Sequence, residues 1–171
     1  MLYTVDTTGD RVLQVNPDGT TILFANLPAA PHPGGGKCVL PAPDSFGGGF
    51  LVSTYNIMET DPDIGAILSI SADGTAVTQL TDGLNGAELL TFGPGGPFGT
   101  DLFVPTTGGA ATADGFVFTM SSDGTLTLFM SNLDAVSVAF DTQGILGGGM
   151  FVSDINDNLG AGKIWRVTPR Q

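Results

Sequence analysis

The carboxylates of this chain gather in short loops that have the composition of a calcium site. The sequence Met-Glu-Thr-Asp-Pro-Asp-Ile-Gly places Glu59, Asp61 and Asp63 within one loop. Asp154 and Asp157 share the stretch Asp-Ile-Asn-Asp-Asn. Closely spaced carboxylate and amide oxygens are ligands that Ca²⁺ prefers. The sequence therefore predicts Ca²⁺ binding there, but neither loop has the full spacing and terminal Glu of an EF-hand, and solvated acidic loops are the simpler interpretation.

Few other side chains could take part in catalysis or metal binding. Glu88 is a further metal-ligand candidate, because it opens the run Ala-Glu-Leu-Leu-Thr-Phe close to Asn85. The only histidine, His32, lies between two prolines, and the only cysteine, Cys38, heads an apolar run. A lone cysteine forms no disulfide within its chain and in such a run is usually a small core residue. No catalytic triad is predicted, and no glycine run opens a helix to hold phosphate.

The charge of the chain limits its partners. Seventeen acidic residues against five basic ones give a formal net charge of -12. Such a surface repels phosphate backbones, so nucleic acid is not an expected partner, whereas cations and basic partners are favoured. No apolar stretch approaches the roughly 20 residues of a membrane helix. We expect an extracellular or cell-surface protein whose leader is removed or not included.

Three copies of Asp-Gly-Thr divide the chain into a tandem repeat. They begin at Asp18, Asp73 and Asp123, at intervals of 55 and 50 residues. Each follows an alternating apolar run, the pattern of a half-buried strand. An Asp-Gly pair suits a tight hairpin in which both central residues take a positive φ. Intervals of this length are typical of a four-stranded β-propeller blade.

Aligned on the triplet, the repeats contain four strand types, A to D in chain order. Strand A is expected at Ala87–Phe92 and Ala135–Phe140, with a degenerate copy at Lys37–Leu40. Strand B follows a glycine-rich connection, strand C precedes the triplet, and strand D follows it. The expected ranges are Phe50–Val52, Leu102–Val104 and Met150–Val152 for strand B, Val12–Val15, Ile67–Ile70 and Val117–Met120 for strand C, and Thr21–Ala25, Ala76–Leu80 and Leu126–Met130 for strand D.

This pattern resembles the NHL-type and gluconolactonase-like six-bladed β-propellers. Ala135–Asp141 corresponds to their GLAFD-like strand, Gly149–Asp154 to their G-LFVAD strand, and Arg11–Thr20 to their RI-V-PDGT hairpin. The resemblance covers essentially the whole chain and implies an all-β propeller, a fold that does not specify one function. In gluconolactonase-like enzymes, Glu, Asn and Asp at the starts of inner strands hold a central divalent cation.

The resemblance therefore implies an alternative function, a metal-dependent lactonase- or esterase-like hydrolase with Glu88 at the channel mouth. Matching by position puts Glu88 opposite Val136 and Gly36 of the neighbouring repeats. Two of the ligands that such a site would need are then missing.

The two ends of the chain each lack one strand of the repeat. Leu2–Asp6 matches strand B, so the first blade lacks strand A, and Lys163–Pro169 matches strand C, so the last blade lacks strand D. The expected fold is a propeller of about three and a half blades with 14 strands. Such a chain would be a segment of a longer propeller, would be completed by other chains, or would form a flattened four-bladed ring.

Unpaired strand edges are templates for pairing with another chain. We therefore expect a single repeat domain over residues 1–171, with repeats at roughly 1–34, 35–84, 85–134 and 135–171. Its expected function is that of a non-catalytic binding or self-assembly module whose partner is itself, as a homo-oligomer or filament, or the rest of a longer propeller. The residues expected to mediate self-association are Leu2, Tyr3, Val5, Lys163, Trp165 and Arg166.

Overall fold

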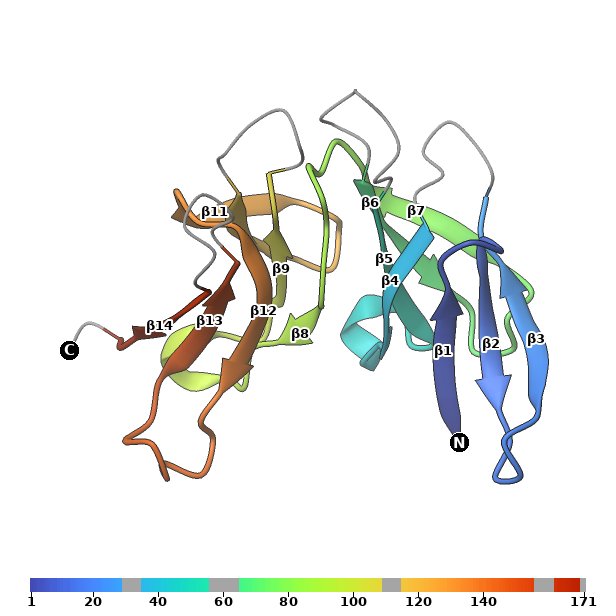
Figure 1. Cartoon of the computed structure of the whole chain (residues 1–171), viewed down its shortest axis with the longest axis horizontal. Coiled ribbons are helices and arrows are strands. Elements are labelled where there is room, and N and C mark those ends of the chain that lie inside the picture. Colours follow the sequence, from blue (N-terminus) through green and yellow to red (C-terminus); the bar gives the residue numbers. More distant parts are fainter. Residues whose placement is uncertain (29–34, 56–64, 109–114, 156–161, 170–171) are drawn as a thin grey trace.

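The computed structural model is all-β. It describes residues 1–28, 35–55, 65–108, 115–155 and 162–169. These residues form 14 strands in four antiparallel sheets that follow one another along the chain (Figure 1). The expected inventory of three, four, four and three strands is confirmed. Two short 3₁₀ helices, η1 (Asp44–Phe46) and η2 (Gly96–Phe98), lie in connections between strands.

The four sheets are called I to IV in chain order, and in each of them consecutive strands are neighbours. Sheet I holds β1 (Leu2–Asp6), β2 (Arg11–Val15) and β3 (Thr21–Asn26); sheet II holds β4 (Gly35–Pro41), β5 (Phe50–Tyr55), β6 (Gly65–Ile70) and β7 (Val77–Thr81); sheet III holds β8 (Thr91–Phe92), β9 (Leu102–Thr106), β10 (Phe116–Met120) and β11 (Leu126–Ser131); sheet IV holds β12 (Ala135–Phe140), β13 (Met150–Asp154) and β14 (Lys163–Val167).

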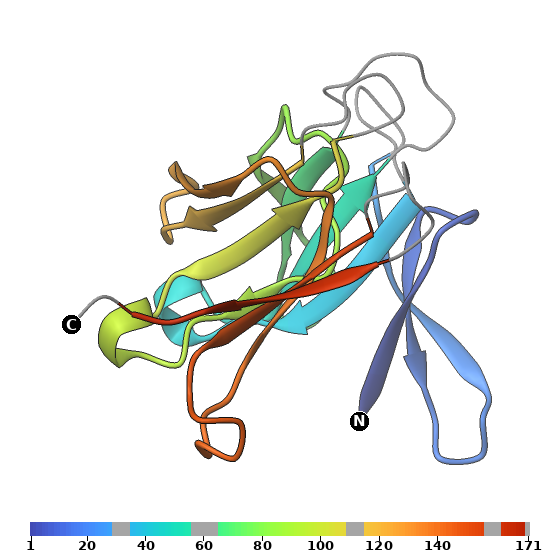
Figure 2. The same cartoon turned by 60° about the vertical axis from the view of Figure 1, so that its left-hand side comes forward.

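Each pair of consecutive sheets encloses a hydrophobic core. Val12 of sheet I packs with Val52 and Ile70 of sheet II, and Ile67 of sheet II packs with Leu102 of sheet III. Val117 of sheet III packs in the same way with sheet IV. The front face of sheets II to IV thus lies toward the preceding sheet, and the back face of sheets I to III lies toward the following sheet; the same terms are used for the front face of sheet I and the back face of sheet IV. Sheets I and IV lie on opposite sides in Figure 1, and Figure 2 shows the molecule turned so that sheet IV comes forward.

Alternation along the strands explains which residues reach which core. Successive side chains of a strand point to opposite faces. In β5, Val52 therefore belongs to the core with sheet I and Leu51 to the core with sheet III, and both are fully buried. The first strands of neighbouring sheets bring the sheets together, because β4 lies beside β1 and β12 lies beside β8 and β9.

The Asp-Gly-Thr turns differ from the expected tight hairpin. Gly19, Gly74 and Gly124 take a positive φ of 84°, 75° and 87°, but the preceding aspartates do not. The reason is that the glycine N–H donates to the carbonyl three residues earlier (Gly19 to Asn16, 3.0 Å), which makes the aspartate the third residue of the turn and leaves the positive φ to the glycine. The carboxylate also folds back on its own turn. In the first copy, the Asp18 Oδ1 accepts hydrogen bonds from the Thr20 N–H at 3.0 Å and from its Oγ1 at 2.7 Å. The triplet is a self-contained hydrogen-bonded unit.

The expected strand Ala87–Phe92 is also shorter than predicted. Only Thr91–Phe92 form regular strand β8, while Ala87 and Leu89 make isolated bridges. The cause is that this segment divides its hydrogen bonds between sheets: Ala87 bridges to Thr106 and the Glu88 N–H donates to the Pro105 carbonyl in sheet III, but Leu89 turns to sheet IV. The Leu89 N–H donates to the Val136 carbonyl of β12 at 3.1 Å. On the other side, the Ser53 Oγ of β5 donates to the Glu88 carbonyl at 2.6 Å. The segment links sheets II and IV across sheet III.

Candidate functional site

Glu88 lies between Ala87 and Thr91, where the register with β9 shifts by one residue, as it does in the first strands of sheets II and IV. The strand register shifts between Gly36 and Cys38 in β4 and between Ala135 and Ser137 in β12. The same shift separates the Ala87–Thr106 bridge from the Thr91–Phe103 pair in sheet III. Gly36, Ala87 and Ala135 pair with equivalent residues of the next strand, so the residues that follow them, Lys37, Glu88 and Val136, are equivalent. This corrects the expectation that Glu88 matches Gly36, whose counterpart is Ala87.

The surroundings of Glu88 combine partial burial with one opposite charge. Burial raises the pKa of Glu88 above its ordinary value, and the positive charge of Lys37 opposes this. The Lys37 ammonium lies 5.2 Å from the centre of the Tyr55 ring, a distance at which a cation is attracted by an aromatic face. Glu88 and Lys37 thus bring opposite charges to equivalent positions of neighbouring sheets. A metal site would need several anionic or neutral oxygen ligands there instead.

Asp154 is the other described carboxylate among the expected metal ligands. It is only 3% exposed at the end of β13. Its Oδ1 accepts a hydrogen bond from the Asp134 N–H at 3.2 Å, and its Oδ2 accepts one from the Trp165 indole at 2.9 Å. These contacts give the carboxylate a structural role, since they tie the outer strand β14 and the start of β12 to β13.

The remaining acidic candidates Glu59, Asp61, Asp63 and Asp157 lie outside the described residues, as does His32. Within the described ranges, no three His, Cys, Asp or Glu side chains come close enough together to hold a metal ion. The calcium site stays a prediction about the loops. Nor, among these residues, is there a helix with the length and apolarity needed to cross a membrane.

The front face of sheet I is exposed, although its residues match a buried face. Leu2 pairs with Val15 as Leu102 pairs with Met120 and as Met150 pairs with Val167. Leu102 and Met150 are fully buried against the preceding sheet, whereas Leu2 is 65% exposed. Leu23, opposite Leu13 in the outer strand, is 51% exposed, and its counterparts Gln79 and Leu128 in the outer strands of sheets II and III are exposed as well, so the contrast with internal sheets rests on Leu2.

The back face of sheet IV shows the same contrast more strongly. In β14, Ile164 pairs with Ser153, as Ile67 pairs with Ser53, Val117 with Pro105 and Val12 with Val5. Ile164 is thus the counterpart of Val12, Ile67 and Val117, each of which is fully buried against the following sheet. Ile164 itself is 76% exposed. The two end faces are built like internal faces but have no sheet against them within the described residues.

The structure divides the six residues expected in self-association. Tyr3 and Val5 point toward sheet II, where the Tyr3 ring lies 4.4 Å from the Phe50 ring. Trp165 lies on the front face of sheet IV with its indole on Asp154. Arg166 donates to the Gly147 and Gly148 carbonyls at 2.7 and 3.0 Å. The residues of this set that remain exposed are Leu2, Lys163, Trp165 and Arg166.

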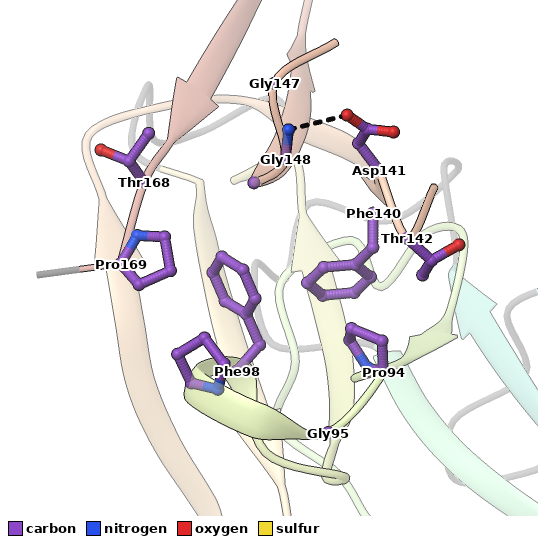
Figure 3. A pocket seen from close by; sticks show the side chains of 12 residues that line it. Pro94, Gly95, Phe98, Phe140, Asp141, Thr142, Gly147, Gly148, Thr168 and Pro169 are labelled. Atoms are coloured by element: carbon purple, nitrogen blue, oxygen red, sulfur yellow. Dashed lines mark hydrogen bonds between the residues drawn. The ribbon is translucent and has the colours of Figure 1, made fainter. Parts of the chain in front are cut away.

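A shallow pocket of about 560 Å³ lies where sheets III and IV meet, at the connections after their first strands. Figure 3 shows the rings of Phe98 and Phe140 side by side, 5.2 Å apart, with Pro94 and Pro169 beside them. Asp141 at its rim accepts backbone hydrogen bonds from Leu146 and Gly148 at 2.7 and 2.8 Å. Desolvation raises the pKa of Asp141, but these hydrogen bonds stabilise its ionised form, so the pKa is lowered on balance.

A second pocket repeats this arrangement between sheets II and III. Its wall includes Phe92, whose ring lies 5.0 Å from that of Phe46, together with Pro41 and Pro43. Mostly apolar walls with a few polar groups are typical of ligand-binding pockets.

Comparison with known protein families finds no family model that matches this chain, and comparison with curated protein sequences finds no match either.

Ile164 was not among the residues expected to mediate self-association, although the sequence carries a signal for its position. Strand C, matched residue by residue, puts Ile164 in register with Val12, Ile67 and Val117. The paired aromatic pockets had no such signal, since they depend on how two connections distant in sequence come together.

Proposed function

We propose that the chain is a segment of about three and a half blades of a propeller-type fold, related in pattern to NHL-like repeats, and that it acts as a non-catalytic binding and self-assembly module outside the cell or on its surface. The observation that carries the proposal is the contrast between internal and end faces. Ile164 is exposed at the position where Val12, Ile67 and Val117 are fully buried.

The packing of the sheets supports the propeller arrangement. The sheets follow chain order, each meanders from a first strand to an outer strand, and the first strands of sheets I and II and of sheets III and IV lie side by side. These are features of blades placed around an axis. The open edges of β1 and β14 add hydrogen-bonding groups that a further chain would satisfy.

The alternative is a metal-dependent lactonase- or esterase-like hydrolase with a cation at the channel mouth. One observation favours it, the half-buried Glu88 with its raised pKa, because perturbed carboxyls are frequent in active sites. Its counterparts Lys37 and Val136 offer no carboxylate to share a cation. Metal analysis of the purified protein separates the two functions: a stoichiometric, tightly bound divalent cation supports the hydrolase.

The self-assembly function is tested by removing residues 163–171. The truncated chain loses β14 and with it the exposed Ile164, so we expect it to be monomeric where the intact chain is oligomeric. Sheets II and III should remain folded, because their shared core contains no residue of β14. An oligomer of unchanged size after truncation would count against the proposal.

A further inference from the structure

We infer that the back face of sheet IV is the docking site for the front face of sheet I of a second copy of this chain. The inference rests on the proposed self-assembly function and names the surface and the partner. Within the chain, the same kind of junction occurs three times, and each time the back face of one sheet covers the front face of the next. The front face of sheet I and the back face of sheet IV correspond to the two sides of such a junction, and within the described residues no sheet covers either of them.

The apolar residues of the two end faces correspond to those that form the internal junctions. On the back face of sheet IV, Phe151 matches the fully buried Leu51 and Phe103, and Ile164 matches Val12, Ile67 and Val117. On the front face of sheet I, Leu2, Leu13 and Val15 match the buried Leu102, Leu68 and Ile70, but Leu2 is exposed and Leu13 and Val15 are only half-buried. A monomer would leave this apolar surface in water, at a cost of roughly 25 cal/mol for every Å² that a partner would cover.

Close packing shows that the front face of sheet I is ready to accept a neighbour. A Cβ added to Gly74 would lie 2.3 Å from the Phe24 carbonyl of sheet I, and one added to Gly124 would lie 2.5 Å from the Leu80 carbonyl of sheet II. Their counterpart Gly19 has nothing within 4 Å. Beside it, Met1, Leu2, Val15 and Pro17 contribute to a hollow of about 530 Å³.

The charge distribution favours a second copy as the occupant. All 17 carboxylates precede residue 163, while three of the five basic residues, Lys163, Arg166 and Arg170, follow Gly162. In the described part, both Lys163 and Arg166 are exposed on β14, but Lys163 pairs with Asp154 on the front face, whereas Arg166 pairs with Phe151 on the back face. The back face of sheet IV therefore presents a basic side chain in an otherwise acidic molecule, which lowers the electrostatic cost of contact with another acidic copy.

A junction of this kind is heterologous, since it joins two different faces. Each copy retains one free front face and one free back face, so further copies add until the rotation closes a ring or the chain continues as a filament. Two blocked variants can therefore complement each other. A copy with a blocked front face still offers its back face, and a copy with a blocked back face still offers its front face.

The test uses the full chain with the front-face variant Leu2→Asp/Leu23→Asp, the back-face variant Ile164→Asp and the control Ile145→Asp. The Ile145 side chain is 77% exposed, as exposed as Ile164, but it lies in the connection between β12 and β13. All three side chains that are replaced on the end faces are at least half exposed, so the fold is expected to persist, and circular dichroism checks it.

Sedimentation equilibrium should show oligomers of the intact chain and of the control, and an association weakened about 100-fold or more in each blocked variant alone. An equimolar mixture of the two blocked variants should form a one-to-one dimer and no larger species.

Three results would overturn the inference. Unchanged association of the Ile164→Asp variant, with the intact chain oligomeric, would place the interface elsewhere while leaving self-assembly intact. Dimers of one blocked variant alone, with none gained on mixing, would indicate a contact between like faces. An intact chain that is monomeric at every concentration would remove the proposed self-assembly as well.

Discussion

At the scale of single residues, the aspartates of the repeat act as turn anchors. The Asp73 Oδ1 accepts hydrogen bonds from the Ser71 Oγ at 2.6 Å and from the Thr75 N–H at 3.1 Å. Asp123 has the same partners in Ser121 and Thr125. These bonds favour the ionised form and lower the pKa of both carboxyls to about 2. Part of the acidity of the chain is therefore explained by its turns.

Acid should weaken the fold through these turns. Because the folded pKa of about 2 lies below the unfolded value of about 3.9, the folded state binds fewer protons, and the stabilisation present above pH 4 is lost as the pH falls toward 2. The variant Asp73→Asn/Asp123→Asn should be less stable at pH 7 and should show a smaller loss between pH 4 and 2. Chemical denaturation across this range measures both, with the exposed Asp101→Asn as control. An unchanged pH slope in the double variant would contradict the assignment.

Glu88 should behave in the opposite way. Its pKa is raised by burial, so the folded state binds the proton more tightly and is favoured as the pH falls below that pKa toward about 4.5. Removing the charge with Glu88→Gln should raise the Tm at pH 7 by about 2 °C or less. Lys37→Met should lower the Tm, because it removes the charge that opposes the burial of Glu88. A lower Tm for Glu88→Gln would show instead that the carboxylate makes a favourable contact.

Calcium binding is a prediction about Glu59, Asp61 and Asp63, with Asp154 and Asp157. A cation that binds only the folded state stabilises it by about 2.7 kcal/mol at a free concentration 100 times its Kd. Thermal unfolding in millimolar Ca²⁺ should then occur at a higher temperature than in chelator. The variant Glu59→Gln/Asp61→Asn/Asp63→Asn should lose the difference. Coincident melting curves of the intact chain in the two buffers would exclude the site.

At the scale of strands and sheets, the repeat pattern was sufficient to predict most elements. Alternating apolar runs and the Asp-Gly-Thr spacing located 14 strands and their order, because a strand buried on one or both faces leaves a periodic signature. The boundaries of β1 agree with the prediction, and β12 does as well. What could not be predicted depends on contacts between sheets. The Ala87–Leu90 segment is irregular because Leu89 pairs with β12, which no local pattern records.

The packing of turns onto neighbouring sheets gives a prediction at this scale. Gly19, Gly74 and Gly124 share a positive φ, so replacing any of them by Ala costs about 1–2 kcal/mol in backbone strain. A Cβ added to Gly74 or Gly124 would also clash with a carbonyl oxygen of the preceding sheet, whereas one added to Gly19 would meet nothing within 4 Å. Gly74→Ala and Gly124→Ala should therefore each be destabilised by about 2 kcal/mol more than Gly19→Ala. Urea unfolding of the three variants measures this, and equal losses would show that the sheets are less tightly packed.

At the scale of the whole molecule, the described residues form a series of four sheets, each packed on the next. Between sheets II and III the facing side chains cover each other, so Ile67 and Leu102 are fully buried. The ends carry the same residue pattern without a covering sheet, as Leu2 and Ile164 show. The candidate site was predicted from sequence only in part. The number of strands per repeat predicted that the first and last sheets lack a strand. Which face of sheet IV presents Ile164 could be assigned only from the register of β14 with β13.

The mass of the intact chain in solution tests the central claim most directly. One chain has a mass of 17.4 kDa. Light scattering over a range of protein concentrations should give a multiple of this mass, because the front face of sheet I and the back face of sheet IV cover each other in successive copies. A mass of 17.4 kDa at every concentration, with the sheets folded, would contradict the account.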